Sequence, residues 1–459
     1  MIHFGLSGVV PILLYTAGIV ALLLSIFWRP IAGLYFLIPL IPLQTVRYHL
    51  IGLPLGQSMV DVILLGVAIG LLVRGEQIFP ATPWNMLLCG YAIFTFISLC
   101  LGSFYLGRSL PLPGDPRLAD WKNYMVMPLI LFLVAAAVKD ARQMKILVWL
   151  MCAAVLSLDR SFWDTVSGRD FSAFSYDLRD EGGMGYAGVN GFAAFEAQFV
   201  VFLAALSAFE PKRLLKYGYL ALALFSTICL MYSLSRGGYL AILLGMLFLG
   251  IVKQRKLLVI LAVFIFTWTS IVPAAVRERV TMTYDETSGN LDHSAATRVN
   301  LWSEAMATFD SSPVVGVGFY TYAYSQHLNN YKDSHNFYVK VLAETGVVGL
   351  LVFLWLLAKT LRAGLTLFWS AQDPFLNSLG LGLASWVVAA AVANFFGDRW
   401  TFLQVNGYMW VLAGMVARGL LVQTSSAEVE AKADAGSEGV SWDTLGSQPA
   451  PSLGSLVNP

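Results

Sequence analysis

The sequence predicts an all-α fold, a polytopic membrane helix bundle of 12–13 spans with one large loop outside the bilayer. Of the 459 residues, 57% are hydrophobic and only 12% are charged, whereas soluble domains carry about 25% charged residues. The apolar residues form continuous runs, and such a run satisfies its own backbone in lipid as a helix, which excludes a barrel of alternating strands. One polar stretch, 276–336, is long enough to form the external loop.

Thirteen apolar segments are candidates for the spans, since a helix needs about 20 mostly apolar residues to cross the bilayer. They are 8–28, 31–43, 58–73, 84–106, 124–138, 143–158, 190–209, 216–234, 238–252, 256–275, 337–358, 377–396 and 402–421. Three of them, 31–43, 124–138 and 238–252, are short, so twelve spans is the alternative count. We interpret the first segment as a retained span, because no basic stretch or cleavage site marks it as a removable signal.

Four groups of basic residues set the expected orientation. They are Lys139, Arg142 and Lys145; Lys212, Arg213 and Lys216; Lys253, Arg255 and Lys256; and Lys359 and Arg362. With the spans above, all four groups fall on one side of the membrane, which the positive-inside rule identifies as the cytoplasm. Loops 159–189, 276–336 and 397–401 then lie on the opposite side.

The chain divides into three parts by composition. Residues 1–158 contain N-terminal membrane spans, and residues 159–423 form a membrane region that includes the long loop 276–336. Residues 424–459 are rich in Ser, Ala, Glu, Gly and Pro, which predicts a disordered cytoplasmic tail. Inside the long loop, an apolar stripe at helical spacing predicts an amphipathic helix that lies at the membrane surface or under the rest of the loop; the stripe consists of Val299, Trp302, Met306 and Phe309.

Composition and motifs exclude several classes of function. The net charge is +1 and no basic cluster interleaved with aromatic residues occurs, so we expect no nucleic-acid partner. The four cysteines lie in apolar runs without CxxC spacing, and no HExxH motif or phosphate-binding lysine loop occurs. The acidic residues of 177–181 favour a salt-bridged loop over a metal site, because Arg179 lies among them. We therefore expect no metal and no cofactor.

Arg236 is the charged residue whose position most favours a function. It lies between two apolar runs in "LMYSLSRGGYLAILLG", and the two glycines behind it leave space for a ligand. A guanidinium group matches phosphate oxygens. The alternative is an arginine that reaches from a helix end to the interface. Its predicted side, opposite the basic loops, argues against that alternative.

Other charged residues collect on the same predicted side. His335 stands where the polar loop becomes a span, and it is followed by Asn336. An imidazole can exchange a proton near neutral pH. A histidine at the membrane interface without a function is an equal alternative. Arg298 opens the predicted loop helix. Asp398 lies beside Arg399 in a short turn, where an ion pair with Arg399 or Arg236 is as consistent with the pattern as a catalytic role.

Three segments together resemble the O-antigen ligase and polysaccharide polymerase superfamily over about 185–405. "SLSRGGYLAILLGMLFLG" resembles its Ser-Arg-Gly span, and "SHNFYVKVLAETGVVGLLVFL" resembles its His-Asn segment, which leads into a span. "RVNLWSEAMATFDSSPVVGVGFYTY" resembles the loop segment between them. Their order and spacing carry the resemblance.

The resemblance implies an O-antigen ligase-like membrane glycosyltransferase in the bacterial inner membrane, with its active site facing the periplasm. Such an enzyme transfers a glycan from an undecaprenyl-diphosphate carrier to a hydroxyl of a glycan, lipid or protein acceptor. The functional positions of the family match Arg236, Arg298 and His335, and Asp398 is the best match to a late aspartate of the ligases. Asn336 belongs to the His-Asn pair, for which we expect a contact with substrate.

Residues and resemblance together suggest one mechanism and leave alternatives open. Arg236 and Arg298 would stabilise the diphosphate leaving group without a metal ion, and His335 would accept the proton of the attacking hydroxyl, with inversion at the sugar carbon. Within the superfamily, a polysaccharide polymerase or a protein O-oligosaccharyltransferase is the alternative. A solute transporter is the alternative from another class, although the sequence shows no two matching halves.

Overall fold

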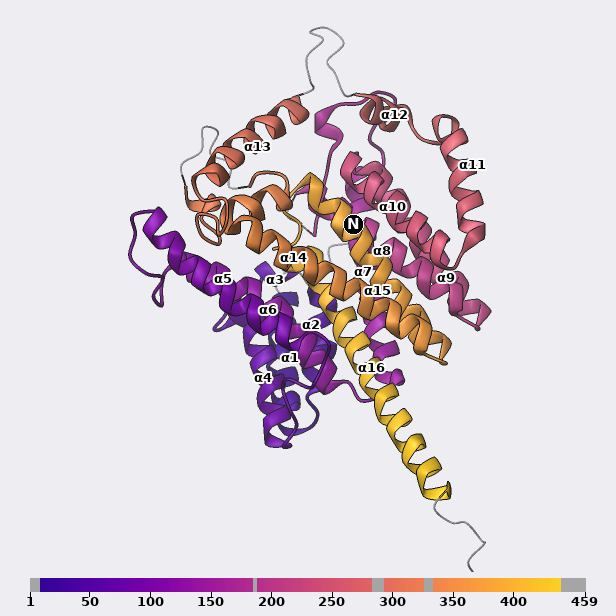
Figure 1. Ribbon diagram of the computed structural model, residues 1–459. Coiled ribbons are helices and arrows are strands. Elements are labelled where there is room, and N and C mark those ends of the chain that lie inside the picture. Colours follow the sequence, from indigo (N-terminus) through magenta and orange to yellow (C-terminus); the bar gives the residue numbers. More distant parts are fainter. Residues whose placement is uncertain (1–8, 185–187, 283–292, 326–332, 439–459) are drawn as a thin grey trace, which may run out of the picture. The chain divides into compact units, whose positions relative to one another are not determined.

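The structure is a computed structural model that describes residues 9–184, 188–282, 293–325 and 333–438. Over these ranges the chain is all-helical and has no β-strand, as predicted (Figure 1). The N-terminal helices are α1 (Val10–Phe27), α2 (Ile31–Leu40), α3 (Gln44–Tyr48), α4 (Met59–Val73), α5 (Asn85–Tyr105), α6 (Pro116–Ala137) and α7 (Ala141–Val166). Those that follow are α8 (Val189–Phe209), α9 (Arg213–Tyr232), α10 (Arg236–Val252), α11 (Arg255–Ile271), α12 (Ala274–Thr281), α13 (His293–Ser311), α14 (Phe337–Ser370), α15 (Pro374–Ala393) and α16 (Leu403–Glu438).

Each of the thirteen predicted apolar segments coincides with a helix. Within the described residues, ten helices are long and apolar enough to cross a membrane, or eleven if the pair α11 and α12, bent by 112°, counts as one span. The helices α2 and α10 are apolar but shorter. The chain is therefore a multi-pass membrane protein, although length and composition support fewer full spans than the predicted number.

Helix α8 lies at the centre of the bundle. It is buried almost continuously from Gly191 to Ser207 and packs against α9, α10 and α15. The neighbouring helices α14 and α15 cross closely because each has a glycine at the crossing. A Cβ atom on Gly364 would lie 2.7 Å from the carbonyl oxygen of Gly380, and one on Gly380 would lie 2.6 Å from that of Gly364. Small residues at helix crossings are typical of membrane bundles.

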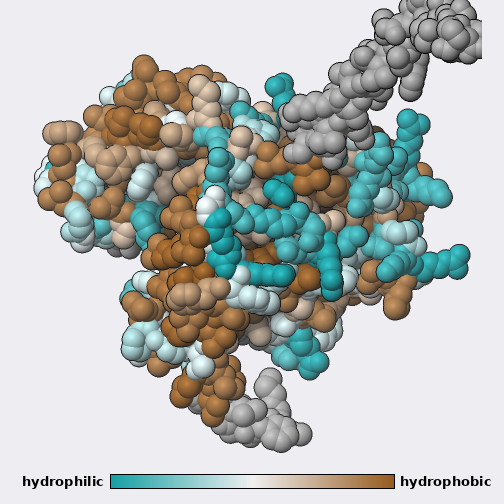
Figure 2. Space-filling view, turned by 90° about the horizontal axis from the view of Figure 1, so that it is seen from below, coloured by the Kyte–Doolittle hydropathy of each residue, from teal (hydrophilic) through white to brown (hydrophobic). Residues whose placement is uncertain are grey.

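Peripheral helices present apolar side chains outwards. Helix α11 has no buried residue, and Val259, Ile260 and Phe266 on it are exposed. Continuous apolar surface of this kind suits lipid and not water. Figure 2 shows the lower face of Figure 1, where hydrophilic residues spread over the middle beside hydrophobic residues. This pattern is expected of one end of a membrane bundle.

Helix α14 is longer than the predicted span and is interrupted. It reaches Ser370, so Lys359 and Arg362 lie within the helix and not in a loop after it. Gly346 inside it has non-helical backbone angles, with φ at +65°. An unbroken helix would bond the N–H groups of residues 347 and 348 to the carbonyl groups of 343 and 344. Here all four groups bond to the loop 313–318 instead.

Each of the four backbone groups that the break in α14 leaves open finds a hydrogen-bond partner in this loop. Val347 and Val348 donate to the carbonyl oxygens of Pro313 and Val314 at 3.0 and 3.2 Å. In return, the N–H groups of Val317 and Gly318 donate to the carbonyl oxygens of residues 343 and 344 at 3.2 and 2.7 Å. The loop can approach α14 so closely because a glycine stands on each side of the crossing, Gly316 in the loop and Gly346 in the helix. A Cβ atom on Gly316 would lie 2.3 Å from the backbone of α14.

The predicted helix in the long loop exists as α13, which buries other side chains than those of the apolar stripe. Its buried positions are Leu301 and Ala305, whereas Val299 and Met306 are exposed. Ala305 packs with Tyr322 and Ala343, so α13 rests on the start of α14. The stripe through Val299 has larger side chains, but the stripe through Leu301 faces α14.

The C-terminal segment differs in part from the prediction of disorder. The compact unit of the chain extends over Met1–Gly419, and Leu420–Pro459 forms a second unit. Within that unit α16 remains helical to Glu438, although disorder was expected from residue 424. Its alanines, glutamates and lysine have high helix propensity, which explains the difference. The rest of the predicted tail, 439–459, lies outside the described residues.

Candidate functional site

His335 precedes α14 in a strained backbone conformation. Its φ angle is +54°, a left-handed value that costs a non-glycine residue about 1 kcal/mol or more. Its main-chain N–H donates to Oδ1 of Asp333 at 3.0 Å, and its Nδ1 lies 3.3 Å from Oδ2 of the same carboxylate. The His335 side chain is 33% exposed.

Asn336 has a clear structural role as the N-cap of α14. Its side-chain oxygen accepts hydrogen bonds from the N–H groups of Tyr338 at 3.0 Å and Val339 at 3.3 Å. These donors have no partner inside the first turn of a helix, and an asparagine cap satisfies them. The cap explains why an asparagine follows the histidine. The predicted contact of Asn336 with substrate stays a prediction.

Asp398 joins the same network from the turn between α15 and α16. Its Oδ2 forms an ion pair with Nζ of Lys340 at 2.8 Å, and both side chains are buried. Its main-chain N–H donates to Oδ2 of Asp333 at 3.3 Å. Asp333 therefore contacts both His335 and Asp398, although its position in a polar loop does not distinguish it in the sequence. The sequence also gave no indication of Lys340.

Electrostatics keep Asp333 ionised. Burial by itself would raise the pKa of this carboxyl group. The hydrogen bond from His335 and the positive charges of Lys340 and Arg399 outweigh burial, so the pKa of Asp333 lies well below its usual range. In Arg399, burial lowers the pKa of the guanidinium, and the negative charges of Asp333 and Asp398 oppose that change. The region thus holds charges of both signs close together.

Lys340 and Glu344 connect this network to the loop that completes α14. The ammonium group of Lys340 lies 4.7 Å from the ring centre of Tyr320, a cation–π contact. One carboxylate oxygen of Glu344 accepts the N–H of Tyr322 at 3.1 Å. Lys340, Glu344 and Tyr320 also line a small pocket between α5 and α14. Glu344 therefore holds the loop through Tyr322.

Arg236 begins α10 at the same end of the bundle. Leu234 just before it has a left-handed φ of +54°. One guanidinium nitrogen of Arg236 donates to the carbonyl oxygen of Met282, the residue that follows α12. Gly237 lies directly against Phe396, since a Cβ atom there would be 2.8 Å from the Cβ of Phe396. This glycine lets the start of α10 contact the end of the α15 segment.

Arg179, Arg279 and Arg298 lie close together, and Arg236 is joined to them because Met282 contacts both Arg236 and Arg279. Nη2 of Arg179 donates to Oδ1 of Asn190 at 2.8 Å, and Oγ of Ser235 donates to the same oxygen at 2.8 Å. Burial, together with the positive charges of Arg279 and Arg298, lowers the pKa of Arg179 to about 10. We call Arg179, Arg236, Arg279 and Arg298 the arginine cluster.

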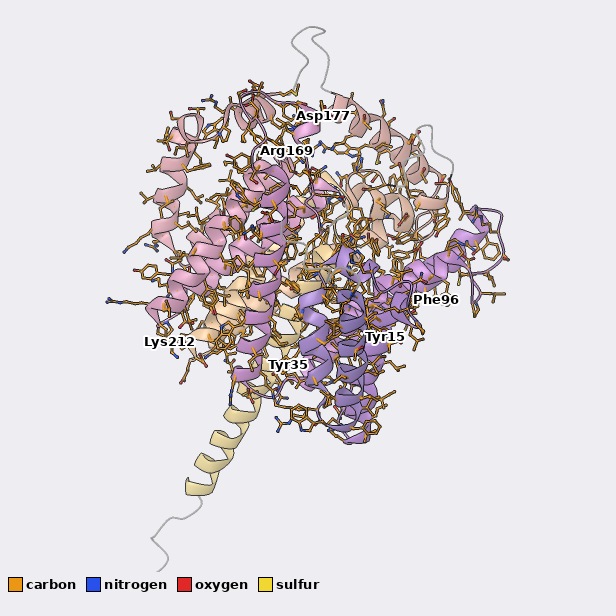
Figure 3. All side chains as sticks on the ribbon, turned by 180° about the vertical axis from the view of Figure 1, so that it is seen from behind. Tyr15, Tyr35, Phe96, Arg169, Asp177 and Lys212 are labelled. Atoms are coloured by element: carbon orange, nitrogen blue, oxygen red, sulfur yellow. The ribbon has the colours of Figure 1, made fainter. Side chains whose placement is uncertain are left out.

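Aromatic residues and a loop support the arginine cluster. The guanidinium of Arg279 lies over the rings of Phe174 and Tyr176, at 4.9 and 5.3 Å from their centres. The N–H of Phe174 donates to Glu278 of α12 at 2.6 Å, which fixes the loop before α8 against α12. Figure 3 shows Arg169 and Asp177 of this loop at the end of the bundle opposite Lys212.

The structure groups the predicted site residues into two neighbouring sets. His335, Asn336 and Asp398 share one network, whereas Arg236 and Arg298 belong to the arginine cluster. The two sets meet through the contact of Gly237 with Phe396, two residues before Asp398. A second contact supports this, because the ring of Tyr338 packs on Phe395 with centroids 4.5 Å apart. All predicted site residues therefore lie at one end of the helices.

The structure identifies the partners of the charged residues. The acidic loop before α8 contains an ion pair between Arg169 and Asp180, and Arg179 bonds to Asn190. The ion pair of Asp398 that the structure shows is formed with Lys340, a partner that the sequence did not indicate. No group of three or more His, Cys, Asp or Glu side chains suited to a metal occurs within the described ranges.

Comparison with known proteins adds one match. Residues 221–354 match a family model described as O-antigen ligase. The match contains Arg236, Arg298 and His335, and it ends before Asp398. The comparison with curated proteins found no match.

Proposed function

The chain belongs to the O-antigen ligase superfamily, and from this premise we propose that it transfers a glycan from an undecaprenyl-diphosphate carrier to an acceptor hydroxyl. Membership implies a glycosyltransferase-like activity in general. The donor, the periplasmic side of a bacterial inner membrane and the inverting chemistry are our proposal. The observation that carries it is the juxtaposition of the arginine cluster with the His335–Asp333 pair at one end of the bundle.

The arginine cluster would bind the diphosphate of the donor. Positive charges gathered around Arg179 suit a ligand with several negative oxygens, and guanidinium groups match such oxygens in geometry. When the bond between the sugar carbon and the phosphate oxygen breaks, its electron pair stays on the diphosphate. Fixed positive charges stabilise that developing charge. Many sugar-transfer enzymes use a metal ion to stabilise this charge. Because the arginines would take that role here, we expect transfer to persist in EDTA.

His335 would act as the general base. Because Nδ1 faces the ionised Asp333, the proton of the neutral ring belongs on Nδ1, and Nε2 keeps its lone pair. Nε2 accepts the proton of the acceptor hydroxyl while the hydroxyl oxygen forms the new bond to the sugar carbon. Attack opposite the leaving diphosphate inverts that carbon. Asp333 is a positioning residue, because it orients the ring and stabilises the imidazolium that forms.

Transfer by the purified protein tests the proposal. The protein in liposomes would be given an undecaprenyl-diphosphate glycan and, separately, a lipid-linked core sugar, a second lipid-linked glycan and a serine-containing peptide. We expect product with one of these acceptors. Replacing Arg236 by Ala should lower the rate by about a hundredfold, the size of a lost leaving-group contact. Transfer at the wild-type rate by this variant, at equal abundance, would contradict its role.

The same preparation separates the alternatives. Product from the core sugar indicates a ligase, product from the second glycan a polymerase, and product from the peptide a protein O-oligosaccharyltransferase. Uptake of small solutes into the liposomes without any glycan product would instead indicate the transporter class and overturn the proposed function.

A further inference from the structure

A cavity of about 250 Å³ lies in the N-terminal region, outside the matched residues 221–354. Its walls are aliphatic and aromatic side chains of α2 and α4, namely Leu37, Leu40, Met59 and Val60 with Phe36. Pockets for whole small ligands are about 300–1,000 Å³. The cavity therefore fits part of an extended chain better than a complete molecule.

Polar side chains stand on one side of this cavity. Gln44 and Arg47 of α3 line it together with Gln404 at the start of α16. The amide of Gln404 donates to the side-chain oxygen of Gln44 at 3.0 Å, which ties α16 to α3. Arg47 is half-buried. An apolar wall with a cation at its margin suits an amphiphile that carries an anionic group.

The cavity lies at the same end of the bundle as the candidate site. The N–H of Thr45 donates to the carbonyl oxygen of Met184, in the loop that carries Arg179, at 2.9 Å. Gln404 follows Asp398 by six residues, across the turn that holds the His335 network. The loop of the arginine cluster and the turn of the His335 network therefore both adjoin helices that line the cavity.

We propose that this cavity binds the lipid anchor of the glycan acceptor, with an aliphatic chain along α2 and α4 and a phosphate group at Arg47. This inference rests on the proposed function, because it assigns the acceptor and not the donor. The donor diphosphate has its own cations in the arginine cluster. An acceptor without a lipid anchor would have no use for an apolar cavity beside the site.

Photo-crosslinking tests this proposal independently of catalysis. The probe is phosphatidic acid with a diazirine in one acyl chain, in nanodiscs of phosphatidylcholine with the full-length protein. We expect labelled peptides from α2 and α4. Val60→Trp, which fills the cavity, should lower this labelling at least fivefold, whereas Leu65→Trp on the exposed side of α4 should not. Arg47→Gln should lower labelling by the phosphatidic acid probe but not by the matching diacylglycerol probe.

The outcomes distinguish this proposal from the proposed function. Absence of label from α2 and α4, or equal labelling in Val60→Trp, would overturn it. Stronger labelling of the same peptides by an undecaprenyl phosphate diazirine probe, in competition with phosphatidic acid, would give the cavity to the donor and also overturn it. If labelling is as expected but no glycan transfer occurs with any acceptor, the lipid site stands and the proposed function fails.

Discussion

The carboxylate of Asp333 receives two main-chain hydrogen bonds, from His335 and Asp398, and faces the imidazole ring. Burial would raise its pKa, but the side-chain hydrogen bond from His335 and the positive charges of Lys340 and Arg399 outweigh burial, so the pKa lies below the usual value. A folded-state pKa below the unfolded value of about 3.9 means that folding is favoured by ionised Asp333. That contribution is complete above about pH 4 and is lost as the pH falls through the lower, folded-state value.

Asp333→Asn should therefore destabilise the protein in a pH-dependent way. We expect a loss of roughly 1.5–3 kcal/mol at pH 7, the size of a hydrogen bond to a charged group. The difference from wild type should shrink as the pH is lowered to about 3, where the unfolded aspartate binds a proton. Thermal unfolding in detergent at several pH values measures both. A difference in stability that is constant with pH would show that Asp333 stabilises the fold through packing and not through its charge.

His335→Asn is the substitution that isolates chemistry from conformation. Asparagine tolerates the left-handed φ of +54° better than most residues, so the start of α14 should keep its structure. We expect transfer to fall by about a hundredfold or more, as for a lost general base, with the melting temperature nearly unchanged. Liposome assays and thermal unfolding give the two values. Undiminished transfer would exclude His335 as the base.

Arg179→Gln should weaken donor binding, since it removes a charge from the arginine cluster. We expect KM for the undecaprenyl-diphosphate donor to rise by about tenfold, the effect of one charge-assisted contact, with little change in KM for the acceptor. Arg169→Gln is the matched control, because Arg169 lies in the same loop but pairs with Asp180. Equal effects of the two variants would indicate a general effect on the loop.

Single residues differ in how far the sequence predicts them. Arg236, Arg298 and His335 stand out by their positions and by family resemblance, and the structure gathers them at one end. Arg279 and Lys340 do not, because their neighbours come from distant segments and no local pattern records that proximity. Asp333 lies two residues before His335, but a charged side chain in a polar loop is not distinctive without its partners.

Among the elements, the broken helix α14 gives the sharpest prediction. Gly346→Ala would put a Cβ atom 2.3 Å from the backbone at Val314 and would impose a side chain on a φ of +65°. The loop cannot move away without losing four hydrogen bonds. We expect little folded protein, judged by size-exclusion chromatography in detergent.

Gly90→Ala is the control for this substitution. A Cβ atom at Gly90 meets nothing within 4 Å, and alanine favours a helix. This variant should be as stable as wild type or slightly more stable. Normal yield of Gly346→Ala would show that the crossing of loop and helix can relax.

Elements were predictable where hydrophobicity alone determines them. Each apolar run became a helix because lipid leaves the backbone no other partner. The buried face of α13 was not predictable, since the stripe through Leu301 and Ala305 is less apolar than the one through Val299 and Met306. Tertiary contact with α14 selects the smaller side chains. The break at Gly346 could not be predicted either, because the sequence around it has the composition of an uninterrupted span.

For the whole molecule, the orientation of the bundle is the property to test. Ala173→Cys lies in the exposed loop before α8, and Lys212→Cys lies exposed at the other end, after α8. The positive-inside rule predicts that a membrane-impermeant maleimide labels Ala173→Cys in intact cells and labels Lys212→Cys only after the membrane is opened. The reverse pattern would place the arginine cluster in the cytoplasm and exclude a periplasmic reaction.

The exchange of hydrogen bonds between α14 and the loop 313–318 has a consequence for biosynthesis. The loop leaves the ribosome before Gly346 does, so its two donors and two acceptors exist before the helix that needs them. Until the two segments meet, the interrupted turn would carry open polar groups into the bilayer, which costs several kcal/mol for each group. Insertion of α14 and seating of the preceding loop must therefore occur as one event.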